Sequence, residues 1–93
     1  MPSDLGPLSR DVIIVNELGL HARAAAKLAK LAQQAAGAVW LQAGSERVDA
    51  KQIIDILTLA AGKGTPLKVE MASAADIEIL DRIVSLIGQG FGE

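Results

Sequence analysis

Hydrophobic positions along this chain form short continuous runs that alternate with segments of helical periodicity. Residues 12–15 are all apolar and predict a strand that is buried on both faces or nearly so. The alanine-rich segment that begins at or near His21 separates apolar from polar positions, which predicts a helix with its stop at Gly37. Its expected apolar face consists of Ala22, Ala25, Leu28, Ala29 and Ala32. The chain therefore begins with a predicted strand followed by an amphipathic helix.

The remainder of the chain repeats this alternation. Residues 39–49 contain two short strand-like runs around a Gly-Ser-Glu turn, which predicts a hairpin. A short helix through residues 53–57 is expected next, with Asp49 or a neighbour as its cap. Residues 67–71 alternate between apolar and polar, as in a strand with one wet face. Ser73 then begins a capping-box-like sequence before a third helix. The inward positions of that helix are predicted to be Leu80, Ile83, Val84 and Ile87.

The predicted order β-α-β-β-α-β-α indicates the fold class. Strands separated by helices and by one hairpin favour an α+β domain, in which helices cover one face of a mainly antiparallel sheet. Trp40 is out of phase with its apolar neighbours and is expected on the open face of the sheet or at its edge. Residues 1–10 contain two prolines and are expected to form a flexible tail, which leaves residues 11–93 as a single domain.

Composition excludes several classes of function. Half of the residues are hydrophobic, which argues against a disordered chain, and a net charge of −2 argues against nucleic-acid binding. There is no cysteine and only one histidine, so thiol chemistry and a histidine-rich metal site are excluded. No signal pattern or long apolar stretch predicts export or membrane insertion, and a cytoplasmic protein is expected. The acidic residues show no catalytic pairing, so we expect no enzyme activity and no cofactor.

The single histidine is the strongest functional candidate. His21 follows a glycine turn and opens the first predicted helix, where unpaired backbone N–H groups and the helix dipole favour an anion. The same dipole favours the neutral imidazole, which keeps one ring nitrogen free to attack. Arg23, on the first helical turn, can reach a phosphoryl oxygen. These residues predict a protein that takes up a phosphoryl group on His21 and passes it on. The alternative is a histidine that merely caps its helix.

A docking surface is expected beside this site. Lys27 and Lys30 share a helical face with Arg23, and Lys51 could extend them into a basic patch for an acidic partner; the alternative is a solvated helix face. Successive isoleucines cannot both face inward on a helix, so at least one of Ile53 and Ile54 should be exposed. Together with Leu57, these residues could form the apolar centre of the surface. One surface would serve donor and acceptor in turn, so we expect it to be modest in area and to bind weakly. Nothing in the sequence suggests more than a monomer.

Residues 19–23, Gly-Leu-His-Ala-Arg, followed by an alanine-rich helix, resemble the active-site signature of the HPr family, the histidine phosphocarriers of the bacterial phosphotransferase system. The resemblance extends over about residues 11–93 and implies an open-faced β-sandwich, with a four-stranded antiparallel sheet under three helices. It further implies that His21 accepts phosphate at Nδ1 from enzyme I, which itself is phosphorylated by phosphoenolpyruvate. His21 would then donate the group to an enzyme IIA domain. Arg23 would stabilise the phosphate. The second docking element is implied at Lys51, Ile53, Ile54 and Leu57.

The sequence also departs from the usual HPr pattern. Ala24 replaces the proline that commonly follows the arginine, at small expected cost because alanine is a good helix former. Gln52 occupies the place of a serine that a dedicated kinase phosphorylates in many relatives, so we expect no regulatory serine site. Asp55 adds a negative charge to the docking helix. Residues 88–93 resemble the nitrogen-related branch, often called NPr. A regulatory module that docks in a phosphorylation-dependent way is the alternative function.

Overall fold

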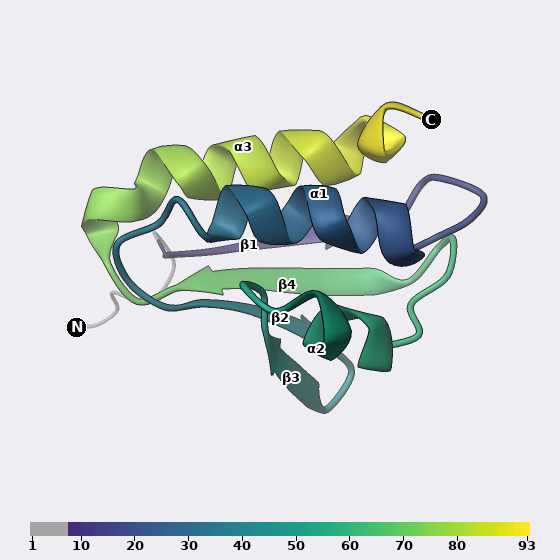
Figure 1. The fold of residues 1–93 in the computed structure, drawn as a ribbon, viewed down its shortest axis with the longest axis horizontal. Coiled ribbons are helices and arrows are strands. Elements are labelled where there is room, and N and C mark those ends of the chain that lie inside the picture. Colours follow the sequence, from purple (N-terminus) through teal and green to yellow (C-terminus); the bar gives the residue numbers. More distant parts are fainter. Residues whose placement is uncertain (1–7) are drawn as a thin grey trace.

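The computed structural model describes residues 8–93 and has helices packed on one face of a four-stranded antiparallel sheet (Figure 1). The strand order is β1-β4-β2-β3. The strands are β1 (Ser9–Ile13), β2 (Val39–Ala43), β3 (Glu46–Asp49) and β4 (Pro66–Met71). The helices are α1 (Ala22–Ala32), α2 (Ile53–Thr58) and α3 (Ile77–Gly88), with the short 3-10 turns η2 (Ala74–Asp76) and η3 (Gly90–Gly92). The predicted α+β open-faced sandwich is therefore confirmed.

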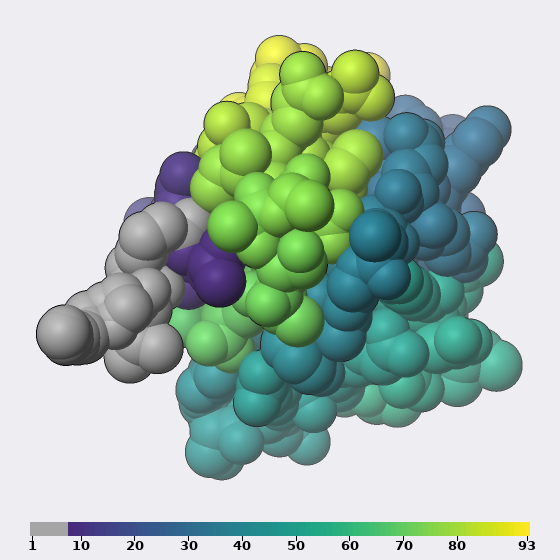
Figure 2. All heavy atoms as spheres, turned by 90° about the vertical axis from the view of Figure 1, so that its left-hand side faces the viewer, coloured from purple at the N-terminus to yellow at the C-terminus, as the bar shows by residue number. Residues whose placement is uncertain are grey.

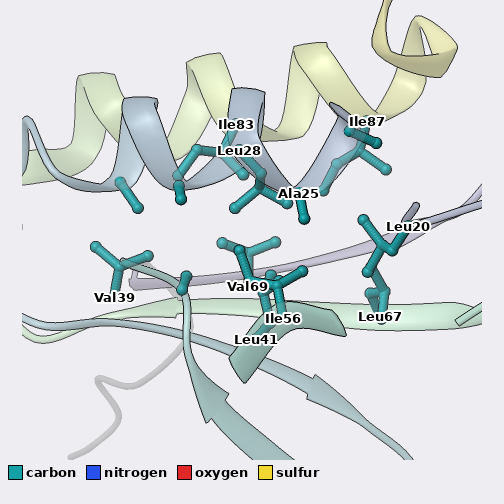
Figure 3. Close-up of a cluster of buried hydrophobic side chains, with 14 of the residues drawn as sticks. Leu20, Ala25, Leu28, Val39, Leu41, Ile56, Leu67, Val69, Ile83 and Ile87 are labelled. Carbon is teal, nitrogen blue, oxygen red and sulfur yellow. The ribbon is translucent and has the colours of Figure 1, made fainter. Parts of the chain in front are cut away.

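The core lies between the sheet and the helices. Alternate residues of β2 and β4, among them Leu41 and Val69, are fully buried against apolar side chains of α1 and α3 (Figure 3). Ile56 is the buried residue of α2 and joins the same cluster. On the other side of the sheet, Trp40 is half-buried, and the guanidinium carbon of Arg47 lies 4.0 Å from the centre of its ring. The prediction that Trp40 faces the open side is confirmed.

The first strand differs from its prediction. We expected residues 12–15 to be buried on both faces or nearly so, but β1 spans Ser9–Ile13 and pairs only with β4, at the edge of the sheet. Ile13 faces the open side and is 56% exposed, because none of the described helices covers that side. The predicted tail at residues 1–10 is also too long, because Ser9 and Arg10 belong to β1 and pair with β4. Residues 1–7 lie outside the described range.

Two helix boundaries also differ from the prediction. Helix α1 ends at Ala32 and not at Gly37, and its exposed first residue, Ala22, does not belong to the buried face. Ala24 is buried instead. The N-cap of α2 is Gln52, while the carboxylate of Asp49 accepts a hydrogen bond from the Lys51 N–H at 2.9 Å. These ends depend on contacts with other elements that helical periodicity does not encode.

Asp76 joins the loop after α1 to the beginning of α3. Its carboxylate oxygens accept hydrogen bonds from the N–H groups of Ala36 at 2.9 Å and Gly37 at 2.8 Å. Figure 2 views this end of the molecule, where the loop after α1 lies against the beginning of α3. The two backbone hydrogen bonds hold the pKa of Asp76 below its ordinary value, with help from the positive charge of Lys51, although burial raises it. Asp76 thus fixes the path of the chain into β2.

No helix within residues 8–93 is long and apolar enough to cross a bilayer. Nor do the described residues include a group of three or more histidine, cysteine or acidic side chains arranged to hold a metal ion.

Candidate functional site

His21 is the N-cap of α1, as the sequence predicts. Its backbone is extended, and its imidazole Nδ1 accepts a hydrogen bond from the Arg23 N–H at 3.3 Å. The preceding turn requires glycine, because Gly19 has a φ of +64° and an added Cβ would lie 2.5 Å from the carbonyl oxygen of Ala61. Leu20 then donates to the same oxygen at 2.9 Å. The turn therefore delivers a partly exposed imidazole to the helix N-terminus.

A second segment reaches this site from the other end of the chain. Residues 90–93, which we call the C-terminal hook, follow α3 and lie at the same end of the molecule as the beginning of α1 (Figure 1). Gly90, Phe91 and Gly92 have φ values of +65°, +60° and +76°. Phe91 is almost completely buried in the core. This sequence of left-handed residues turns the chain back toward α1.

The hook ends in a carboxylate that lies against the imidazole. The Glu93 side chain hydrogen-bonds to Nε2 of His21 and lies 3.5 Å from a terminal nitrogen of the Arg23 guanidinium. It also accepts a hydrogen bond from the buried Asn16 side chain at 3.1 Å. Partial burial raises the pKa of Glu93, but the hydrogen bonds from His21 and Asn16, with the Arg23 guanidinium nearby, outweigh it and lower the pKa overall. The carboxylate is therefore held in its ionised form.

Arg23 lies where the first turn of α1 meets this carboxylate. Its side chain is 67% exposed, and among the described residues Glu93 is the acidic group that forms an ion pair with it. Arg23 can therefore turn toward an anion bound at Nδ1 without being extracted from a buried network. The structure brings His21 and Arg23 together as predicted, and their chemical roles stay predictions.

The expected docking residues fall into two groups. Lys27 and Lys30 are both exposed, and Lys51 is partly buried. Lys27 also donates to the carbonyl oxygen of Phe91 at 2.7 Å, and Lys51 to that of Ala35 at 3.0 Å. Lys27 and Lys51 therefore have structural contacts that the sequence did not predict.

The apolar residues of α2 behave as expected. Ile54 is 75% exposed, and Ile53 and Leu57 are also exposed beside α1. At least one exposed isoleucine was predicted, and the structure exposes both. An apolar patch thus borders the helix that carries His21, and its use in docking stays a prediction.

Sequence reasoning missed two members of the site, Asn16 and Glu93. Asn16 marks the end of the first apolar run, and its side-chain amide also donates to the carbonyl oxygen of Gly19 at 3.0 Å. The sequence signal for Glu93 is limited to the Gly-Phe-Gly sequence before it, which is compatible with a sharp turn. Neither residue is recognisable as a site residue without the fold.

The fold and the site define a small open-faced α+β sandwich with a histidine at a helix N-terminus. The family described as "PTS HPr component phosphorylation site" matches residues 8–89. The phosphocarrier protein HPr of Cupriavidus necator is 42% identical over 86 residues, which cover 92% of this chain and 97% of that protein. The phosphocarrier protein NPr of Shewanella violacea is 38% identical over 90 residues, covering 92% and 94% of the two chains.

The fold comparison agrees. The crystal structure of HPr-C-His from Thermoanaerobacter tengcongensis matches with a TM-score of 0.86 and 30% identity, covering 91% of this chain and 96% of that one. The chain belongs to the HPr family. Relatives named HPr and NPr both match over most of its length, so the likeness does not separate the two branches.

Proposed function

We propose that this chain is a phosphocarrier of the phosphotransferase system, which accepts a phosphoryl group on His21 from phosphorylated enzyme I and donates it to an enzyme IIA domain. The observation that carries the proposal is the position of His21 Nδ1, 3.3 Å from the Arg23 N–H at the N-terminus of α1. Family membership supports the carrier role, because relatives that match over most of the chain are phosphocarrier proteins.

The transfer requires a ring nitrogen with a free electron pair. Nδ1 of His21 attacks the phosphorus atom of the donor's phosphoryl group, a new N–P bond forms, and the electron pair of the broken bond stays with the donor atom that carried the group. The Arg23 N–H, which contacts Nδ1 before transfer, then donates to a phosphoryl oxygen. The guanidinium of Arg23 offers a second, charge-assisted hydrogen bond to the same group.

A carrier must also release the group that it accepts. The donors in this site are few, and the Arg23 side chain is largely exposed. Water therefore screens its charge and limits how strongly the phosphoryl anion is bound. A deep pocket of several buried cations would instead trap the group. The exposed site thus supports the role of a carrier that is the substrate of other enzymes and has no turnover of its own. The proposal also places the protein in the cytoplasm, as a monomer that needs no cofactor.

The partners would dock on the apolar patch of Ile53, Ile54 and Leu57, with Lys27, Lys30 and Lys51 as the basic residues of the surface. One small surface that serves donor and acceptor in turn is expected to bind each weakly. Gln52 has no hydroxyl group, so the proposed carrier is not regulated by phosphorylation at this position.

A relay assay tests this function. The protein, a cognate enzyme I, a IIA domain and labelled phosphoenolpyruvate are mixed, and label on the IIA domain is followed with time. We expect label on the IIA domain only when the protein is present. If the protein becomes labelled but transfers nothing to any cognate IIA domain, the alternative of a regulatory module is favoured. If neither becomes labelled with an active enzyme I, the carrier function is wrong.

A further inference from the structure

We infer that Glu93 is a positioning residue for the phosphoryl acceptor, whose carboxylate holds His21 in the tautomer with its proton on Nε2 and so leaves Nδ1 as the attacking nitrogen. The effect on transfer rate rests on the proposed function, whereas the effect on the tautomer does not. The inference concerns the contact between the C-terminal hook and the imidazole, which is formed by residues 72 positions apart in the chain.

The two contacts of the imidazole agree on one tautomer. A neutral imidazole carries a proton on one nitrogen and an acceptor electron pair on the other. Nδ1 faces the Arg23 N–H, which can only donate, so Nδ1 is the acceptor. Nε2 faces the carboxylate of Glu93, which can only accept when ionised, so Nε2 carries the proton. The partners therefore assign both ring nitrogens.

The Glu93 carboxylate is held in place by the contacts of the C-terminal hook. Phe91 anchors the hook in the core, and Lys27 donates to its carbonyl oxygen at 2.7 Å. The Glu93 N–H closes the turn by donating to the carbonyl oxygen of Gly90 at 3.1 Å. The buried Asn16 side chain binds Glu93 and the Gly19 carbonyl together, which joins the hook to the turn before His21. These contacts fix the carboxylate relative to the ring before any partner arrives.

The same contact serves the phosphorylated state. When Nδ1 forms its bond to phosphorus and Nε2 keeps its proton, the ring becomes positively charged, while one bond to phosphorus is lost in the donor. The Glu93 carboxylate then faces this new positive charge, and Arg23 is available to the phosphoryl oxygens. Glu93 would thus favour transfer by stabilising the charge that develops on the ring, although it does not touch the phosphoryl group.

The test compares Glu93→Ala and Glu93→Gln with the unmutated protein. Glutamine keeps an acceptor oxygen and loses the charge, whereas alanine loses both. Glu78→Gln, in the first turn of α3 and at the opposite end of that helix from the hook, is the matched control. The ring nitrogens of His21 are observed by ¹⁵N NMR in the unphosphorylated proteins at alkaline pH, where the spectra report the neutral ring. Folding is checked through thermal unfolding and the signals of Phe91.

We expect the Nε2–H tautomer to dominate in the unmutated protein and the control, and the share of Nδ1–H to rise in Glu93→Ala, with Glu93→Gln between them. In phosphorylation by enzyme I, kcat should fall about tenfold in Glu93→Ala with little change in KM, as expected for a lost charge-assisted hydrogen bond. Equal tautomer populations in all four folded proteins would overturn the inference. A tautomer shift without phosphorylation of any protein would support the inference and contradict the proposed function.

Discussion

The ammonium group of Lys27 donates a hydrogen bond of 2.7 Å to the carbonyl oxygen of Phe91, and thereby joins the charged face of α1 to the C-terminal hook. Phe91 has a φ of +60° and is 1% exposed, so an unfavourable backbone conformation is retained because the ring is buried. The lysine that the sequence assigned to a docking surface thus also contributes to the structure that presents Glu93 to His21.

Phe91→Ala tests the anchoring of the hook. Removal of this buried ring should lower the free energy of unfolding by about 3 kcal/mol, through lost burial and the cavity that remains. Urea unfolding of the variant and of Phe91→Leu, which keeps most of the apolar volume, measures the effect. A loss below about 0.5 kcal/mol would show that the hook is not held by the core, because that is the size of an ordinary surface substitution.

Arg23→Ala tests the guanidinium near the acceptor nitrogen. The fold should survive, because the side chain is 67% exposed and alanine favours the helix. Phosphorylation by enzyme I should slow roughly tenfold, since one charge-assisted hydrogen bond to the phosphoryl group is lost. Rapid-quench kinetics beside circular dichroism separate the two effects. An unchanged transfer rate would remove Arg23 from the mechanism.

Ile54→Ser tests the proposed docking patch. Ile54 is 75% exposed, so thermal stability should change little, while KM for the protein as substrate of enzyme I should rise severalfold. Ile13→Thr is the control, because it removes an exposed isoleucine from the open face of the sheet, away from α2. Equal KM values for the two variants would mean that partners do not use the α2 patch.

Asp76→Asn tests the carboxylate that binds the loop after α1. The pKa of Asp76 is lowered in the folded state, so its stabilisation is complete above its ordinary pKa and is lost as pH falls through the lowered value. The variant places an amide N–H₂ group against a backbone donor and should melt several degrees lower at neutral pH. The difference in melting temperature between the variant and the unmutated protein should narrow in acid.

Thermal unfolding across acidic and neutral pH, with the exposed Asp81→Asn as control, measures this difference. A difference that stays constant with pH would contradict the role assigned to the Asp76 charge.

Local sequence rules were sufficient for the architecture. The order of apolar runs predicted the α+β fold, the glycine turn predicted a helix opening at His21, and alternation placed Trp40 on the open face. Each of these features depends on neighbours close in sequence. The burial and bounds of β1 were wrong, because its position at the sheet edge depends on its pairing with β4, more than fifty residues away.

Half of the candidate site escaped prediction for the same reason. His21 and Arg23 share one helical turn, so their proximity follows from helix geometry. Glu93 reaches them only because three consecutive left-handed residues reverse the chain after α3. Asn16 acquires its role when it binds that carboxylate. Contacts between residues so far apart in the chain are set by tertiary packing, which the periodicity of a single sequence does not contain.

The most direct measurement is the intact mass of the protein after incubation with phosphoenolpyruvate and a cognate enzyme I, before and after acid treatment. The account predicts one added phosphoryl group that acid removes, and none in His21→Ala, which should fold with a loss of about 1 kcal/mol for its helix cap. A phosphoryl group that survives acid, or one that persists in folded His21→Ala, would contradict the claim that His21 carries it.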